Sequence, residues 1–326
     1  MPGIAPGPGS VCSPSGSASA TPSGASSGWP SGIPVGMSSS SGSSGMPPRY
    51  PHGRAANVAD GMARPITFLS DYGLEDDFVG VCHAVIARIA PDARVIDLNH
   101  GLGRHDVRTA GLVLRRALPY CAPGVHLAVV DPGVGAERRA IALRTTEEDR
   151  ILVGPDNGLL SLAAQRFGGI AEVVDVGRSR HRLEPVSATF HGRDIFAPVA
   201  AHLAAGAPLG DAGDPMDPDE IVRLDMPLAI LEDAVLWAHA VAFDRFGNIM
   251  LDVEHAELAD SGFRLGHAVV VNGRQGVYAT TFSDVPPGEL ILYEDAYRTL
   301  SLAVNRGSAR ELLGVETDDD LRISAP

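Results

Sequence analysis

ITFLSDYGLEDDFVGVCHAVIARIAPDARVIDLNH (66–100) decides the fold class of this chain. Its opening residues, 66–71, form an apolar run that is typical of a buried strand. Residues 76–91 place apolar side chains at helical spacing and stop at a proline. A second strand is predicted over 93–99, so the stretch has the strand–helix–strand order of a parallel unit.

The same alternation continues along the chain. The pattern predicts a helix at 105–118, a third strand at 125–131, strands at 141–145 and 150–154, and a helix at 158–168. Such alternation implies a mostly parallel sheet covered by helices on both faces, so we expect a layered α/β catalytic domain over 63–230. Ligands in such sheets bind beyond the carboxyl ends of the strands, which is where Asp71 and Asp131 fall.

The remaining segments do not continue the strand–helix alternation. Short strand-like runs separated by Gly, Asn and Asp turns predict a smaller all-β, barrel-like domain over 231–314. Residues 315–326 are acidic and are expected to form a solvated C-terminal tail. Of the first fifty residues, 34 are Ser, Gly or Pro, so we expect 1–62 to be a disordered tail that contributes nothing to the core.

Composition excludes several classes of function. The 326 residues carry 26 basic and 40 acidic side chains, and every basic one is arginine. The net charge of −14 argues against a nucleic-acid partner, and the absence of lysine removes Schiff-base and P-loop chemistry. No apolar run approaches the roughly 20 residues that a membrane helix needs. Three cysteines and no secretory pattern at the N-terminus favour a cytoplasmic protein.

Common cofactor and metal motifs are missing. GLGRH (101–105) lacks the third glycine of a dinucleotide loop, and no Cys/His cluster has zinc spacing. His100, His105 and Asp106 are better explained as the polar start of a helix than as metal ligands. We therefore expect neither a metal nor a cofactor.

Polar residues gather in loops where packing does not require them. In VVDPGVGAERR (129–139) the glycines permit a tight turn that can bring Arg138 back beside Asp131. GPDNGLL (154–160), TFHGRDIFAP (189–198) and FDRFGN (243–248) carry similar groups, including His191. Taken alone, each segment also fits a structural turn, and an exposed Asp–Arg pair contributes little to stability.

Taken together, these segments resemble one family. FLSDYGLEDDFVG, VDPGVG, GPDNGLL, FHGRDIFAP, DRFGN and LAVN occur in the order found in the S-adenosyl-L-methionine (SAM) hydrolases that form adenosine. These enzymes are also called SAM hydroxide adenosyltransferases and are relatives of the bacterial fluorinase and chlorinase. The resemblance spans roughly 65–314, which is all of the chain that we expect to be globular.

The resemblance also implies a reaction and a set of site residues. Asp131, Arg138 and His191 match the set that positions and activates a water, which attacks the 5′-carbon of the ribose and expels methionine. The matching substrate-binding positions are Asp71 for the ribose hydroxyls, then Asp76, Asp131, Phe246, Asn248 and Val304. SAM is the substrate, no cofactor is implied, and family members are homotrimers with sites between subunits. Ala296 departs from the usual family pattern, in which a serine at this position helps to hold the substrate carboxylate.

Two alternatives accompany this interpretation. A halogenase of the same fold would use chloride or fluoride as the nucleophile, but those enzymes have a tyrosine where Asp131 stands. A carboxylate beside the nucleophile would repel a halide in a dry site. A protein that binds SAM or adenosine without turnover is the second alternative, because Ala296 removes one anchor for the methionine end.

Overall fold

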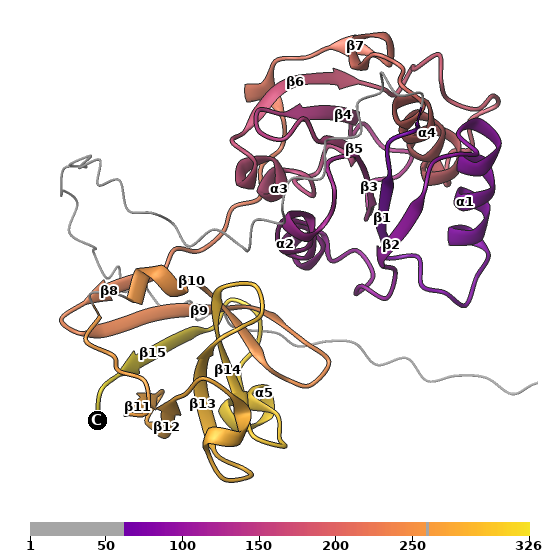
Figure 1. The fold of residues 1–326 in the computed structure, drawn as a ribbon. Helices are drawn as coiled ribbons and strands as arrows, with labels where there is room; N and C mark the ends of the chain where they lie inside the picture. Colours follow the sequence, from indigo (N-terminus) through magenta and orange to yellow (C-terminus); the bar gives the residue numbers. More distant parts are fainter. Residues whose placement is uncertain (1–61, 259–260) are drawn as a thin grey trace, which may run out of the picture. The chain divides into compact units, whose positions relative to one another are not determined.

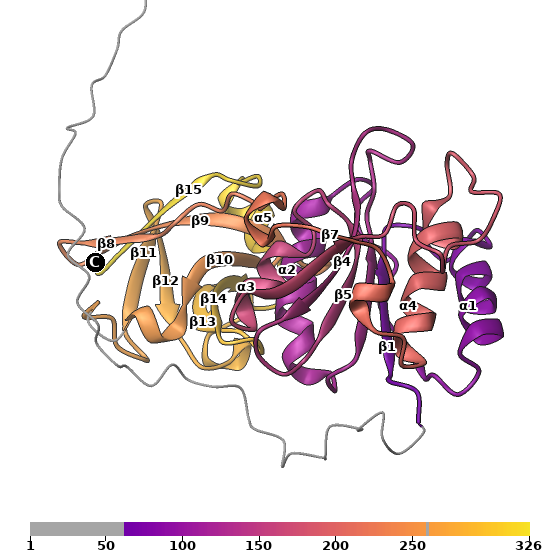
Figure 2. The ribbon, with the colours of Figure 1, turned by 90° about the horizontal axis from the view of Figure 1, so that it is seen from above.

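The computed structural model describes residues 62–258 and 261–326, drawn as ribbons in Figure 1 and Figure 2. The tail predicted over 1–62 lies outside the described residues, apart from Met62. The described residues form an α/β domain followed by a β-barrel domain, which confirms the predicted fold class. In these two ranges no helix is both long and apolar enough to cross a bilayer.

The α/β domain is built on a seven-stranded sheet of order β2-β1-β3-β5-β4-β6-β7. Its strands are β1 (Ile66–Ser70), β2 (Val95–Asn99), β3 (Val125–Val129), β4 (Ala140–Thr145), β5 (Ile151–Pro155), β6 (Ile170–Asp175) and β7 (Asp214–Pro215). Strands β2, β1, β3 and β5 are parallel, whereas β4 pairs antiparallel with β5 and β6, and β6 with β7. The parallel strands bring the ends of β1 and β3 to one edge of the sheet.

Helices cover both faces of this sheet, as the alternation predicts. They are α1 (Phe78–Ile89), α2 (Val107–Ala117), α3 (Ser161–Arg166) and α4 (Ala197–Ala204). Phe68 of β1 belongs to the core shared with α1 and α4, whereas its neighbour Leu69 belongs to the core shared with α2 and α3. Both side chains are fully buried, because successive residues of a strand point to opposite faces.

The second domain is a closed barrel. Its strands are β9 (Val235–Phe243), β10 (Ile249–Glu254), β11 (Ala268–Val271), β12 (Arg274–Tyr278), β13 (Leu290–Glu294), β14 (Thr299–Val304) and β15 (Asp320–Ser324). The order β10-β14-β13-β12-β11-β15-β9 closes on itself through the β9–β10 pairing. Strand β8 (Ile230–Glu232) adds to β9 outside the ring, and helix α5 (Ala309–Leu313) follows β14.

Strand β15 corrects one prediction. We expected residues 315–326 to be a solvated tail, but Asp320–Ser324 lies between β11 and β9 and pairs with both. Leu321 and Ile323 are fully buried in the barrel core, while Asp320 and Arg322 alternate outward. The acidic run just before the strand hides this alternation, which is the mark of a half-buried strand.

Candidate active site

Asp131 and Arg138 form an ion pair beyond the end of β3. The turn between them reverses the chain at Gly135, whose φ of 78° favours glycine, and Gly133 leaves room for the arginine side chain. Arg138 Nε donates to Asp131 Oδ1 at 2.8 Å, and Nη2 donates to Oδ2. The side chain of Arg138 is only 11% exposed and that of Asp131 only 7%. The prediction that the turn brings Arg138 back beside Asp131 is confirmed. Because both side chains are largely shielded from solvent, the pair differs from an exposed surface ion pair.

His191 completes this cluster. Arg138 Nη2 lies 2.8 Å from His191 Nδ1. A guanidinium has only donors, so Nδ1 must accept and the ring proton of the neutral imidazole resides on Nε2. Burial and the charge of Arg138 both lower the pKa of His191 below its ordinary value of 6.5. His191 is therefore neutral at pH 7 and presents an Nε2–H donor.

The segment after His191 is held by a buried carboxylate. Gly192–Phe196 forms a π-helical turn, a distortion that is frequent at functional sites. Asp194 within this turn accepts hydrogen bonds from Arg193 Nε at 2.7 Å, Arg193 Nη2 at 2.8 Å and the main-chain N–H of Ser187 at 2.8 Å. These contacts fix the loop that carries His191, so Arg193 and Asp194 have a structural role here.

Asp71 lies at the same edge of the sheet. It follows Ser70, which is in register with Val129 on β3, so the residues after both strands emerge together. Its Oδ2 accepts from the main-chain N–H of His105 at 2.9 Å. Asp76, the other predicted substrate contact on this domain, is exposed in the bend that leads into α1.

The three predicted contacts on the barrel lie at one end of it. Asp244 Oδ1 accepts from the main-chain N–H groups of Phe246 and Asn248, at 2.8 and 3.0 Å, and its Oδ2 accepts from Asn248 Nδ2 at 2.7 Å. Phe246 is left 68% exposed. Val304 ends β14, the strand that pairs with β10 next to this turn. The exposed aromatic ring and the amide thus share one rigid turn.

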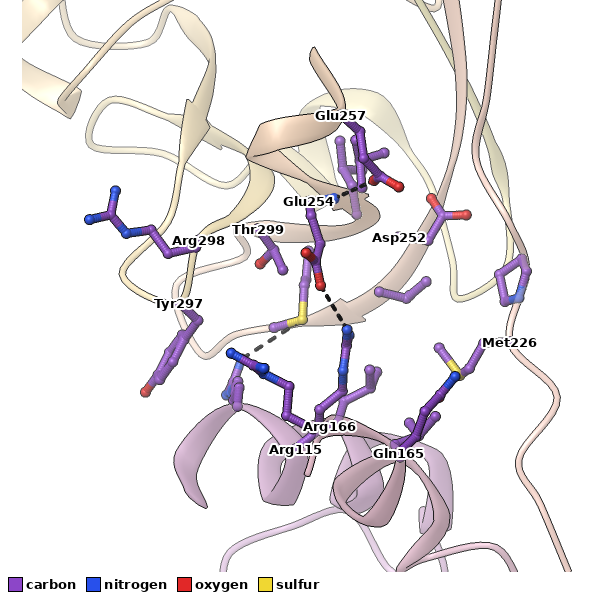
Figure 3. A pocket seen from close by; sticks show the side chains of 18 of the residues that line it. Arg115, Gln165, Arg166, Met226, Asp252, Glu254, Glu257, Tyr297, Arg298 and Thr299 are labelled. Atoms are coloured by element: carbon purple, nitrogen blue, oxygen red, sulfur yellow. Dashed lines mark hydrogen bonds and ion pairs between the residues drawn. The ribbon is translucent and has the colours of Figure 1, made fainter. Parts of the chain in front are cut away.

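Within a single chain these two groups of residues remain separate. Over 62–258 and 261–326, no hydrogen bond, ion pair or aromatic contact joins the Asp131 cluster to the Phe246 turn. A cavity of about 300 Å³, shown in Figure 3, lies elsewhere and is lined by residues of α2, α3 and β10. There Arg115 Nη2 donates to Glu254 Oε1 at 2.9 Å, and none of the predicted site residues belongs to the cavity's lining.

Two residues near Asp131 were not predicted from the sequence as part of the site. Asn157 Nδ2 donates to the carbonyl of Val130 at 2.8 Å and so fixes the peptide that precedes Asp131. Tyr72 packs edge-on against Phe190, and its hydroxyl lies so close to Gly192 that a Cβ there would overlap it. The polar GPDNG turn could have indicated Asn157 as a site residue. For Tyr72, the only indication in the sequence is its position next to Asp71.

Comparison with known proteins places this geometry in a family. Residues 66–213 match the SAM hydroxide adenosyltransferase N-terminal domain, and residues 238–322 match the C-terminal domain. The chain belongs to the SAM hydroxide adenosyltransferase family. The chain's segments 66–213 and 238–322 coincide with the α/β domain and the barrel, so family membership and fold agree.

Several known proteins match this chain over almost the whole of their own length. The (R)-S-adenosyl-L-methionine hydrolase of Salinispora tropica is 48% identical over 260 residues, covering 80% of this chain and 97% of that protein. The protein of the same name from Thermus thermophilus is 42% identical over 277 residues, covering 80% and 99%. A crystal structure of an uncharacterized conserved protein from Thermotoga maritima superposes with a TM-score of 0.74 at 37% identity, covering 79% and 99%.

Fluorinases are more distant. The fluorinase of an Actinoplanes species is 27% identical over 270 residues, covering 74% of this chain and 90% of that protein. The hydrolases are therefore much nearer to this chain in sequence than this halogenase is.

Proposed function

We propose that this chain hydrolyses S-adenosyl-L-methionine to adenosine and L-methionine. The observation that carries the proposal is the half-buried, hydrogen-bonded cluster of Asp131, Arg138 and His191 at the sheet edge beside Asp71, in a chain whose close relatives are named as SAM hydrolases. The substrate is a small molecule. The free thiols of Cys82 and Cys121 suit a reducing compartment, and we place the enzyme in the cytoplasm.

The reaction makes one bond and breaks one. A lone pair of water forms the O–C5′ bond while the C5′–S bond breaks, and its electron pair stays on sulfur. The sulfonium leaves as neutral methionine thioether, so no general acid is needed for the leaving group. Water loses one proton overall, and the attacking oxygen becomes strongly acidic as the bond forms, so a carboxylate is a sufficient base.

Asp131 is the group suited to receive that proton. Each of its oxygens is engaged by Arg138 but keeps a second lone pair, which can accept from a water. His191 cannot serve as the base at Nδ1, since Arg138 occupies that nitrogen. Its Nε2–H would instead donate to the water oxygen and hold it in line, while Arg138 stabilises developing hydroxide character.

The relatives' printed name specifies the sulfonium configuration, and we extend the proposal to it. We expect this chain to prefer (R)-S-adenosyl-L-methionine over the (S) epimer, as the names of the Salinispora and Thermus proteins suggest. Separate incubation with each epimer, followed by chromatography of adenosine, measures the preference. Equal rates for both epimers would contradict this part of the proposal.

We further propose that Asp71 accepts the ribose hydroxyls, that Asp76 contacts the substrate, and that Phe246, Asn248 and Val304 receive the adenine of a substrate bound to a neighbouring subunit. The proposal rests on the separation of the two groups of residues within one chain. A homotrimer would bring the α/β domain of one subunit to the barrel of the next.

Subunit mixing tests this arrangement. Asp131→Asn and Asn248→Ala should each lose most of their activity alone, yet co-expressed chains should regain about a quarter of the wild-type sites, because random pairing joins two intact halves that often. Light scattering of the wild-type protein gives the oligomeric state. A monomer, or mixed assemblies that stay inactive, would overturn the arrangement.

Product identification separates hydrolysis from the alternatives. Incubation with SAM in buffered chloride should yield adenosine and methionine; a halogenated nucleoside would indicate a halogenase, and an unchanged substrate would indicate a binding protein. The proposed chemistry requires no metal or cofactor, so a chelator should leave the rate unchanged. Loss of the rate in chelator, with recovery on adding a divalent ion, would refute the mechanism.

A further inference from the structure

His100 sits beneath the loop that carries Asp71. Its side chain is buried, with 4% exposure, and its ring stands edge-on to Phe68 at a centroid distance of 4.7 Å. From the sequence we expected His100, together with His105 and Asp106, to form the polar start of a helix. Asp106 does cap α2, accepting from the N–H of Thr109 at 2.9 Å, but His100 has no part in that cap.

The imidazole of His100 holds the first residue of the bend that carries Asp71. Its Nδ1 lies 2.7 Å from Ser70 Oγ, and Ser70 Oγ accepts from the N–H of Tyr72 at 3.3 Å. On the opposite side of the ring, Nε2 lies 3.1 Å from Asp97 Oδ1, near enough for electrostatic attraction although off the line of a hydrogen bond. The carboxylate favours a proton on Nε2, so Ser70 donates its hydroxyl proton to Nδ1.

The main chain of His100 holds the other end of the same bend. Its carbonyl accepts from the N–H of Gly73 at 2.7 Å, and Gly73 has a φ of 72°, which lets the chain reverse there. Asp71 thus lies on a bend, 70–73, that is tied at both ends to one residue. The main-chain N–H of His105 then fixes the carboxylate itself by donating to Oδ2, and no hydrogen bond from residues 62–258 or 261–326 reaches Oδ1.

We propose that His100 is a positioning residue for Asp71, aiming its carboxylate at the two hydroxyls of a ribose. The inference rests on the proposed function, in which Asp71 is the ribose acceptor. The order Ser70–His100–Asp97 also resembles a nucleophilic triad, but Ser70 is fully buried and no substrate can reach its hydroxyl. The network serves to hold the loop.

The chain offers a matched control. His83 Nε2 bonds to Asp97 Oδ1 at 2.8 Å, so His83 shares the carboxylate that His100 uses, but it has no hydrogen bond to the 70–73 bend among the described residues. Removing His83 therefore takes away one hydrogen-bond partner of Asp97 without releasing Asp71. Ser70→Ala is a second, smaller variant, which cuts the link from the ring but keeps the bond from Gly73 to the His100 carbonyl.

Calorimetric binding of two nucleosides separates positioning from general damage. Adenosine offers both ribose hydroxyls to Asp71, whereas 2′,3′-dideoxyadenosine offers neither. His100→Ala should weaken adenosine binding about tenfold, because the carboxylate of Asp71 is no longer held toward the ribose hydroxyls. Binding of dideoxyadenosine, which has no such hydroxyls, should stay within about twofold of wild type. Ser70→Ala should show a smaller loss with the same selectivity, and His83→Ala should change neither affinity.

Three results would overturn the inference: equal weakening of both nucleosides by His100→Ala, the same selective loss in His83→Ala, or unchanged adenosine binding in both His100→Ala and Ser70→Ala. If His100→Ala fails to fold, Ser70→Ala decides the outcome alone. Wild-type protein that binds both nucleosides equally would remove the ribose role of Asp71 and this inference with it. Adenosine production from SAM, measured on the same wild-type sample, reports separately on the proposed function.

Discussion

Two substitutions of His191 test the role that its hydrogen bonds assign to it. An asparagine amide reaches roughly the position of Nδ1 and can accept from Arg138, whereas a glutamine amide reaches roughly that of Nε2 and can donate to a water. If His191 acts as an Nε2–H donor, His191→Gln should retain more activity than His191→Asn. A base at Nδ1 is already excluded by the 2.8 Å contact with Arg138 Nη2.

The size of the effect follows from the bond that is lost. A hydrogen bond to a group with anionic character contributes about 1.5–3 kcal/mol, which corresponds to roughly ten- to a hundredfold in rate when the bond matters most in the transition state. His191→Asn should therefore lower kcat by about that factor, with little change in KM. Single-turnover measurement of adenosine formation, with thermal unfolding as a check on folding, gives the comparison.

The pH dependence has a defined sign. Because burial and Arg138 lower the pKa of His191, the neutral ring persists down to its ordinary value of 6.5 and further. The wild-type rate should stay level as the pH falls to about 6.5 and decline only below it. There His191 becomes protonated at Nδ1, so that a second N–H donor faces the Arg138 guanidinium and the hydrogen bond between the two side chains is lost. An activity of His191→Asn equal to that of wild type, or above that of His191→Gln, would refute the donor role of His191.

Three further outcomes are expected. Asp131→Asn should lower kcat by about 10²-fold or more while adenosine affinity changes little, and parental turnover of SAM by that variant would exclude Asp131 as the proton acceptor. Gly192→Ala should lower both the melting temperature and kcat, because its Cβ would overlap the Tyr72 hydroxyl; a variant that matches wild type in both measurements would contradict this packing. The bonds to Asp194 outweigh its burial and lower its pKa, so the stability they supply is complete above the ordinary value of 3.8 and is lost as the pH falls through the lowered one. Thermal unfolding from about pH 6 to about pH 2 should therefore show a flatter acid loss for Asp194→Asn, and identical slopes would refute the assignment.

Local patterns explain which features could be predicted from the sequence. The Asp131–Arg138 pair was predictable because one glycine-rich turn brings together residues that are close in the chain. Helix α4 was not, since all but one of its residues are buried and a helix without a polar face has no amphipathic period to detect. The link between Ser70 and His100 was equally hidden, because it joins two strands through a contact that has no periodic signature.

The closed barrel has a consequence for the entropy of binding. Strand β9 pairs with both β10 and β15, so every strand of the ring has hydrogen-bonded neighbours on two sides and the ring opens only by breaking one of these ladders. Val304 ends strand β14 of this ring, and Phe246 lies in the turn between β9 and β10, where Asp244 Oδ1 accepts from the main-chain N–H groups of Phe246 and Asn248 before any ligand arrives. An adenine that meets both would order almost nothing on the barrel side, so most of the conformational entropy cost of binding would fall on the loops around Asp71 and His191. Hydrogen exchange with and without adenosine should then slow at those loops while the barrel amides, already protected, change little.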